Sequence, residues 1–273
     1  MNIISYSLFG DRLLYWRLIP LLIVANETFF PDFKMRFHVL SEIEQHPIYP
    51  LLKTLSEKTT MVELKIIEKP YKGLEPTIWR MMPLWDPDVH YLFSRDLDSL
   101  PCSEEIRAIR VFIKSGLLVH GIRSHPAHDI RLLAGLCGFK CPELVRKLGI
   151  SFERYMSSNR SHKDGRRGCD QELLQIFFSG FIDQSLDSPI FKAGQVGFEA
   201  VRLPKEMYDS IDLSNVNPVI QKICDENARY SGAVVGISNE AVKHALDAAG
   251  ETGSLVKEVL KTNSALEAQY GAL

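Results

Sequence analysis

Strand-like and helix-like patterns alternate along the first half of the chain, and this alternation constrains the fold more than any other feature. The runs rich in β-forming residues lie at 2–8, 36–40, 61–67, 89–93 and 117–122. The helical patterns that separate them lie at 13–25, 47–58, 78–84 and 103–115. Strands joined by helices form parallel sheets with crossover connections. The sequence therefore predicts an α/β fold, a Rossmann-like, mainly parallel sheet flanked by helices.

Composition excludes several classes of protein. The 273 residues are 45% hydrophobic and 24% charged, which is ordinary for a globular protein and excludes collagen-like, coiled-coil and wholly disordered chains. The formal net charge of -2 gives no overall attraction to nucleic acid or to anionic membranes. An odd number of cysteines, five, without a disulfide framework favours free thiols in a reducing compartment, so we expect a cytoplasmic protein.

The apolar run at 13–25 is interrupted by Arg17 and Pro20. It is shorter than the roughly 20 residues that cross a bilayer, and no basic segment or small-residue cleavage site accompanies it. We expect a buried helix here and no transmembrane segment.

Two aspartates separated by one residue follow the apolar strand at 89–93. Residues two apart in an extended segment point to the same side, so the carboxylates of Asp96 and Asp98 can address one cation. Open α/β sheets bind ligands at the carboxyl ends of their strands, and oxygen ligands suit Mg²⁺ or Mn²⁺. The alternative is that these aspartates cap or solvate a turn.

Five short segments carry further landmarks in a fixed order. They are Ser5-Tyr6-Ser7-Leu8-Phe9-Gly10, Trp79-Arg80-Met81-Met82-Pro83, Arg95-Asp96-Leu97-Asp98-Ser99, the histidine segment at 120–128 with His-Pro-Ala-His, and Cys169-Asp170-Gln171-Glu172-Leu173-Leu174. Together they resemble a bacterial and viral group of glycosyltransferases with the A-type nucleotide-sugar fold. The resemblance covers residues 1–205. We therefore expect a nucleotide-sugar-binding catalytic domain there, and a helical C-terminal extension over 206–273 that packs on it.

The resemblance implies that Asp96 and Asp98 are metal ligands. The Asp-x-Asp segment together with the later Asp-Gln also resembles retaining enzymes of the glycogenin and lipopolysaccharide galactosyltransferase kind. In those enzymes a third metal ligand, often histidine, comes from a downstream segment. Here that segment is Leu186-Asp187-Ser188, with leucine in place of the histidine. Either Asp187 replaces it or the metal has fewer protein ligands.

The same resemblance implies a set of donor-binding residues, which are Ser7, Leu8, Gly10, Arg80, Arg95, Asp96, His125 and His128. An arginine offers a bidentate fork to phosphate or carboxylate, but Arg95 could equally form a structural ion pair that orients Asp98. The histidines could be satisfied structural groups, and Trp79 could stack on a ring or belong to the core.

The resemblance also assigns catalytic roles. Asp98, Asp170 and Gln171 would be the catalytic residues, with the Gln171 amide beside the anomeric carbon and Asp170 on a donor hydroxyl or on the acceptor. This arrangement favours retention of configuration. Asp170 also suits a helix N-terminus with no further role. At Ser124 this chain departs from the aspartate of the group, so the group's sugar preference does not carry over to it.

The function expected from these residues is a metal-dependent glycosyltransferase that uses a UDP-sugar and a hydroxyl acceptor, which is a glycan, lipid or protein. The segment at 154–167, with five basic residues and one acidic residue, reads as a loop. This segment would either close over the donor, hold an anionic acceptor such as the phosphates of DNA, or be a solvated surface loop. The alternatives are transfer to a hydroxylated base in DNA, a non-catalytic sugar-nucleotide or carbohydrate binder, and a nucleotidyltransferase. The sequence sets no oligomeric state.

Overall fold

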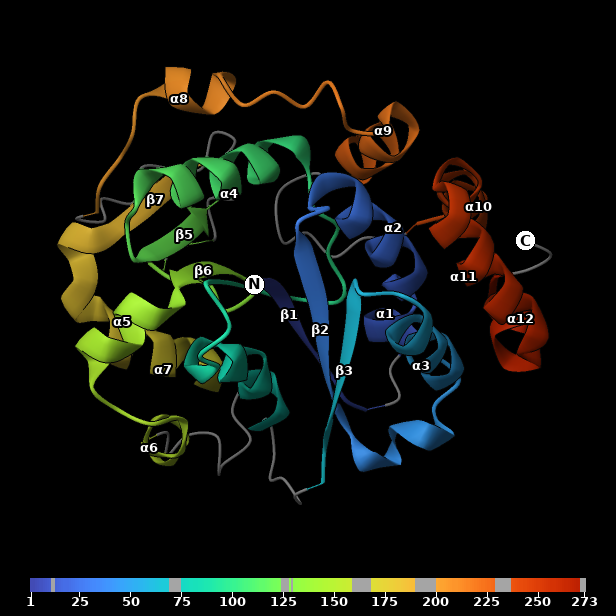
Figure 1. Ribbon diagram of the computed structural model, residues 1–273, viewed down its shortest axis with the longest axis horizontal. Coiled ribbons are helices and arrows are strands. Elements are labelled where there is room, and N and C mark those ends of the chain that lie inside the picture. Colours follow the sequence, from blue (N-terminus) through green and yellow to red (C-terminus); the bar gives the residue numbers. More distant parts are fainter. Residues whose placement is uncertain are drawn as a thin grey trace.

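The computed structural model describes residues 1–10, 13–68, 75–123, 128, 130–158, 168–189, 200–228 and 237–270. Across these residues a seven-stranded sheet runs in the order β3-β2-β1-β4-β6-β5-β7. Its strands are β1 (Asn2–Leu8), β2 (Phe33–Leu40), β3 (Val62–Ile67), β4 (Tyr91–Arg95), β5 (Val119–Arg123), β6 (Leu136–Lys140) and β7 (Ser185–Pro189). Only β6 is antiparallel to its neighbours (Figure 1). The prediction of a mainly parallel α/β sheet is confirmed.

Helices cover both faces of this sheet. One face carries α2 (Ile19–Phe29), α3 (Tyr49–Lys58) and α4 (Ser103–Ser115), and the other carries η2 (Glu75–Trp85), α5 (Cys141–Leu148), α6 (Phe152–Ser157) and α7 (Cys169–Phe178). Successive strand residues point to opposite faces, so Ile4 and Phe93 join the first cluster, whereas Ile3 and Leu92 join the second. Shorter elements complete the layers, namely α1 (Leu13–Trp16), η1 (Ser41–Gln45), η4 (Ser179–Gln184) and α8 (Lys205–Asp209).

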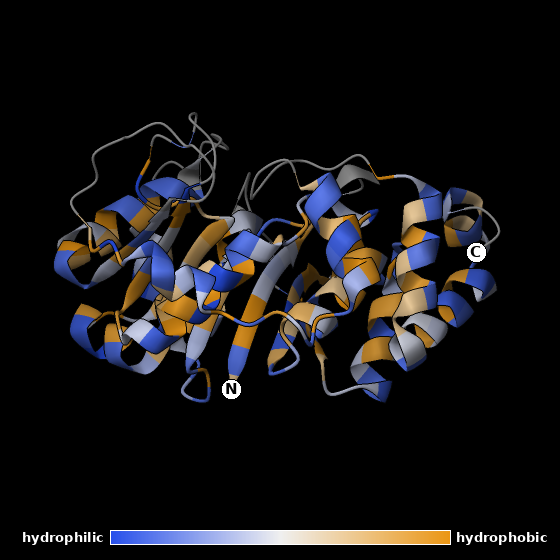
Figure 2. Cartoon of the chain, turned by 90° about the horizontal axis from the view of Figure 1, so that it is seen from above, coloured by the Kyte–Doolittle hydropathy of each residue, from blue (hydrophilic) through white to orange (hydrophobic). Residues whose placement is uncertain are grey.

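The predicted C-terminal extension packs on the first of these faces. It consists of α9 (Pro218–Asn227), α10 (Asn239–Ala248), α11 (Gly250–Thr262) and α12 (Ser264–Tyr270), whose contacts are with α2, α3 and α4. Its helices alternate apolar and polar residues, and they lie across the molecule from α5 and α7 (Figures 1 and 2). Leu246, Val256 and Leu260 are buried in the same cluster as the strand residue Phe93. The division of the chain at residue 205 stays a prediction.

Two strands, β6 and β7, were not predicted from the sequence. Gly138 lies at the centre of β6, and glycine is unfavourable in strands. It is required here because a Cβ atom would lie 2.4 Å from Cε1 of Phe93 in β4. β7 is polar and ends in Pro189, and it forms by parallel pairing with β5. Both strands depend on partners that are distant in sequence.

The helix predicted at 13–25 is two helices, because the chain turns at 17–18 and Pro20 lies in the first turn of α2, where its missing N–H costs nothing. The prediction of a loop over 154–167 is wrong for its first residues, which lie in α6. There Ser151 caps the helix by accepting a hydrogen bond from the N–H of Arg154, and Tyr155 is buried against Trp85. Residues 159–167 lie outside the described part of the chain. In that part, no helix is long and apolar enough to cross a membrane.

The extension also completes the N-terminus of α4. The residue before that helix, Cys102, supplies no capping hydrogen bond. Asp225 of α9 supplies it instead, accepting hydrogen bonds from the N–H and the Oγ of Ser103 at 2.7 and 2.6 Å. Gln221 donates to the same Oγ at 2.8 Å. The first turn of α4 is therefore satisfied by a helix more than a hundred residues away in sequence.

We predict that Asp225→Ala lowers the free energy of unfolding by about 1–2 kcal/mol, because it removes the only side-chain cap seen at this helix start among the described residues. Urea denaturation followed by circular dichroism measures the loss. Glu226→Ala is the matched control, since its exposed ion pair with Lys222 at 3.8 Å contributes little. Equal losses in both variants would contradict the capping role.

Candidate functional site

Polar side chains gather where the parallel strands end, on the face covered by η2, α5 and α7. Strand pairing places one row of residues across this face, which is Ser5, Ser94, Cys137, Gly121 and Asp187. Two residues further along their strands, at the carboxyl edge of the sheet, Ser7, Asp96 and Arg123 lie on the same face. The edge at which open α/β sheets bind ligands therefore carries a hydroxyl, a carboxylate and a guanidinium.

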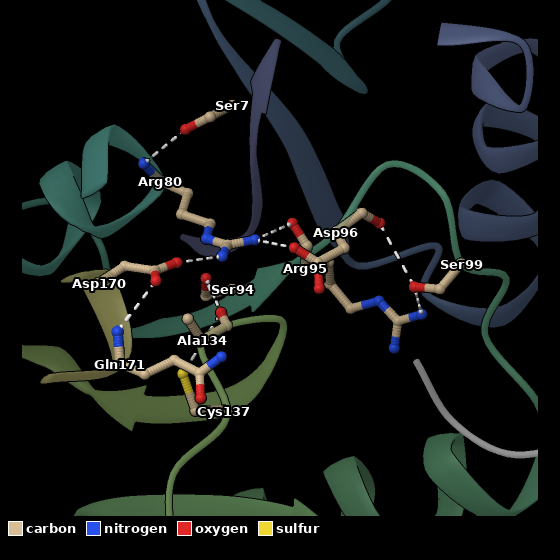
Figure 3. Close-up of polar contacts among 10 residues, drawn as sticks. All are labelled: Ser7, Arg80, Ser94, Arg95, Asp96, Ser99, Ala134, Cys137, Asp170 and Gln171. Atoms are coloured by element: carbon tan, nitrogen blue, oxygen red, sulfur yellow. Dashed lines mark hydrogen bonds and ion pairs between the residues drawn. The ribbon is translucent and has the colours of Figure 1, made fainter. Parts of the chain in front are cut away.

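Arg80 of η2 joins three of the elements at this edge (Figure 3). Its backbone N–H donates to Ser7 Oγ at 3.0 Å, and its Nη1 donates to the carbonyl oxygen of Arg95 at 3.2 Å. The same guanidinium forms ion pairs with Asp96 and, at 2.6 Å, with Asp170. Burial disfavours the charged form of Arg80, but the charges of Asp96 and Asp170 outweigh burial, so the pKa of Arg80 is raised. It is a permanent cation that links β1, β4 and α7.

Asp96 and Asp98 follow the end of β4, and both are half-buried. Residues 97–98 form a turn, so the extended segment from which we predicted that both carboxylates point to the same side is not observed. Asp96 shares one carboxylate oxygen with Arg80. Burial and the neighbouring charge of Asp96 raise the pKa of Asp98 to about 6. Two carboxylates that repel each other in this way favour a bound cation, and oxygen donors are the ligands that Mg²⁺ and Mn²⁺ prefer.

Gly135, which the sequence analysis did not single out, makes room for Asp96. It precedes β6 and lies beside the end of β4. A Cβ atom on Gly135 would lie 1.9 Å from Oδ2 of Asp96 and 2.5 Å from its Cγ. The missing side chain is thus what allows the carboxylate to occupy its position. A lone glycine before a short strand has no sequence signal that separates this role from an ordinary turn.

The Arg95 side chain points away from Arg80 and Asp170, because Arg95 is one residue before Asp96 in an alternating strand (Figure 3). Its side chain is 4% exposed, and its guanidinium forms an ion pair with Glu105 of α4, on the opposite face of the sheet. It also donates to Ser99 Oγ at 3.4 Å. The structure therefore does not bring the Arg95 guanidinium to the site. The ion-pair alternative fits, with Glu105 as the partner instead of Asp98.

Asp170 and Gln171 open α7, and the first of them reaches the site. Asp170 is buried; its Oδ1 accepts the N–H of Gln171 at 3.0 Å and its Oδ2 accepts from Arg80. The structure shows Asp170 in the helix-start role that the sequence left open and adds an ion pair with Arg80, whereas its contact with a donor hydroxyl or an acceptor stays a prediction. Gln171 is half-buried beside Asp170.

The structure does not bring Asp187 to the Asp96–Asp98 pair. Both its carboxylate oxygens accept from Arg123, at 2.8 and 2.6 Å, and Oδ2 also accepts from Arg202 at 3.1 Å. Within the described residues no three histidine, cysteine, aspartate or glutamate side chains converge on one metal position. Asp187 is therefore not a third ligand in this arrangement, and the version with fewer protein ligands stays a prediction.

The remaining predicted donor-binding residues differ in their burial. Leu8 is fully buried at the end of β1, so only its backbone lies at the edge, and Gly10 follows as an exposed turn with φ 72°. His128 is half-buried after β5, whereas His125 lies outside the described residues, as does Ser124. Trp79 is buried, which fits the core alternative.

No protein-family model matches the chain, and no curated protein shows significant similarity to it. Among solved structures, it is similar to a 4-diphosphocytidyl-2C-methyl-D-erythritol synthase from Anaerococcus prevotii, with TM-score 0.44 and 10% identity over 76% of this chain and 95% of that one. It is also similar to a mannosyltransferase from Pyrobaculum calidifontis in complex with GDP-Man and Mn²⁺, with TM-score 0.44 and 12% identity over 99% and 75%. At this level of similarity neither structure assigns an activity to the chain.

Arg80→Gln should lower the free energy of unfolding by about 3 kcal/mol, because it leaves the buried carboxylate of Asp170 without its cation. The value is at the lower end for a buried pair since Asp96, the other partner, is half-exposed. Urea denaturation measures it, with the exposed Arg154→Gln as the control. A loss below about 1 kcal/mol, the range of a surface pair, would show that Arg80 is not the link we describe.

Proposed function

We propose that this chain is a metal-dependent glycosyltransferase that moves a sugar from a nucleoside-diphosphate sugar, UDP-linked, to a hydroxyl acceptor. The observation that carries the proposal is the placement of Asp96 and Asp98 at the carboxyl edge of a mainly parallel sheet, beside the buried Arg80–Asp170 ion pair. The ordered motifs of the sequence supply the reaction class.

The donor set fits a hard divalent cation. Mg²⁺ is usually held by one or two carboxylates together with water and substrate phosphates, and Mn²⁺ accepts the same ligands. Asp98 is the more available ligand because Asp96 also binds Arg80, and Asp187 is held by two arginines. When bound, the cation would neutralise charge on the leaving diphosphate as a Lewis acid.

The protein's own groups would orient these ligands and the donor. Arg80 forms ion pairs with Asp96 and Asp170, so it holds the Asp96 carboxylate in place and ties the start of α7 to the site. Gln171, next to Asp170, would place its amide beside the anomeric carbon, in a reaction that retains configuration. In that reaction the bond from the anomeric carbon to the diphosphate breaks, the acceptor oxygen bonds to the same carbon, and the hydroxyl proton is released.

Donor contacts would come from the backbone of Leu8 and Gly10, from Ser7, whose Oγ accepts the Arg80 N–H, and from His125 and His128. Transfer to a hydroxylated base in DNA would depend on the basic residues at 159–167, which lie outside the described residues.

Asp98→Asn should lower the turnover rate at least about a hundredfold without destabilising the fold. The substitution keeps the size of the side chain but removes a metal-binding charge, and loss of one such electrostatic contact typically costs 10²–10³ in rate. Because burial and Asp96 disfavour the charged form of Asp98, the melting temperature should be equal to or above that of the wild type.

Turnover is assayed as donor hydrolysis or transfer with UDP-, GDP- and dTDP-sugars, with Mn²⁺ and with EDTA. The exposed Asp88→Asn is the control and should keep full activity. Turnover that persists in EDTA would refute the role of Asp96 and Asp98, and turnover by Asp98→Asn at the wild-type rate would do the same.

Gly135→Ala should weaken Mn²⁺ binding at least tenfold, because the new methyl group takes the place of the Asp96 carboxylate. Isothermal titration calorimetry of Mn²⁺ into the full chain measures the change. Gly180→Ala is the matched control, since nothing lies within 4 Å of a Cβ atom there. If both variants bind Mn²⁺ as the wild type does, Asp96 is not a ligand.

A further inference from the structure

A second charged cluster lies at the same edge of the sheet, on β5 and β7. Asp187 is 5% exposed and binds the guanidinium of Arg123 through both carboxylate oxygens. Arg202, which follows the backbone bridge between Leu186 and Val201, approaches the same carboxylate with Nε and Nη2, each 3.1 Å from Oδ2. Arg123 by itself engages both oxygens, so Arg202 is not needed to neutralise Asp187.

A third guanidinium belongs to this cluster. Arg131 donates to the carbonyl oxygen of Ser179 at 3.1 Å and to Ser185 Oγ at 2.8 Å, both of which are neutral acceptors. Burial lowers the pKa of Arg131, and the charge of Asp187 opposes that shift. Arg202 thus approaches an acid that Arg123 already binds, and Arg131 adds a positive charge close enough to feel the charge of Asp187. The side chain of Arg202 is 46% exposed.

Strand register places the cluster relative to Asp96. Ser94 pairs with Cys137 in β6, and Cys137 pairs with Gly121 in β5. Asp96 and Arg123 each lie two residues further along their strands, so they are level and on the same face. With strands spaced about 4.8 Å apart, their Cα atoms are separated by about 10 Å, and β7 lies one strand further.

We propose that Arg202, anchored by Asp187 and supported by Arg131, is an anion subsite that binds a phosphate group on the acceptor. The proposal rests on the glycosyltransferase function above. Guanidinium forks match phosphate oxygens bidentately, and a cluster with more guanidiniums than carboxylates suits a dianion better than a monoanion. Arg202 follows the bridge to β7, and β7 lies three strand spacings, or about 14 Å, from β4. This exceeds the spacing of adjacent phosphates in a diphosphate, so we assign the subsite to a group other than the donor's diphosphate.

The test uses the full chain saturated with UDP and Mg²⁺, into which inorganic phosphate is titrated by calorimetry at constant ionic strength. Arg202→Gln should weaken phosphate binding at least tenfold, and Arg202→Lys should weaken it less, because lysine keeps the charge but not the fork. The affinity for UDP should change less than twofold. Lys205→Gln, three residues on and 80% exposed, removes one positive charge from the surface and should leave phosphate binding unchanged.

Phosphate binding that is the same in Arg202→Gln and the wild type would overturn the proposal. So would a loss of UDP affinity with phosphate binding intact, because it would assign the cluster to the donor diphosphate. If the wild type does not bind UDP, the proposed glycosyltransferase function fails by itself. The phosphate titration of the nucleotide-free protein then still tests the subsite. Loss of phosphate binding in Arg202→Gln but not in Lys205→Gln would support the anion subsite.

Discussion

The candidate site depends on one buried cation between two carboxylates. Arg80 is held by Asp96 from the sheet and by Asp170 from α7, and its N–H is held by Ser7 from β1. A charge removed from water is tolerated only when it is paired, so the three elements must stay together for Arg80 to stay buried. The same interaction positions a predicted metal ligand and the start of the helix that carries Gln171.

The alternation of side chains along β4 separates two neighbouring charged residues into different roles. Asp96 faces η2 and α7, where the site lies, whereas Arg95 faces α4 and pairs with Glu105. A shift of register by one residue would exchange them and bury a carboxylate against an apolar layer. The buried Arg95–Glu105 pair thus helps to fix the register that presents Asp96.

The C-terminal helices contribute to this arrangement from outside the sheet. Asp225 of α9 caps α4, and α4 carries Glu105, the partner of Arg95. The apolar residues of α10 and α11 lie in the same cluster as Phe93 of β4. The extension therefore shares the core that supports the end of β4, and it is connected to the candidate site through α4.

The sequence by itself determined the features that depend on near neighbours. The strands that become β1 to β5, the helices between them and the spacing of Asp96 and Asp98 follow from local patterns of period 2 and 3.6. Only the tertiary structure decided the rest, because it depends on residues far apart along the chain. Arg80 meets Asp170 across ninety positions, Gly135 is required only because Asp96 lies against it, and β6 and β7 exist by pairing with distant strands. Likewise, the resemblance predicts Asp187 as a metal ligand, yet Arg123 and Arg202 bind its carboxylate in the structure. No pattern in the sequence links either arginine to Asp187.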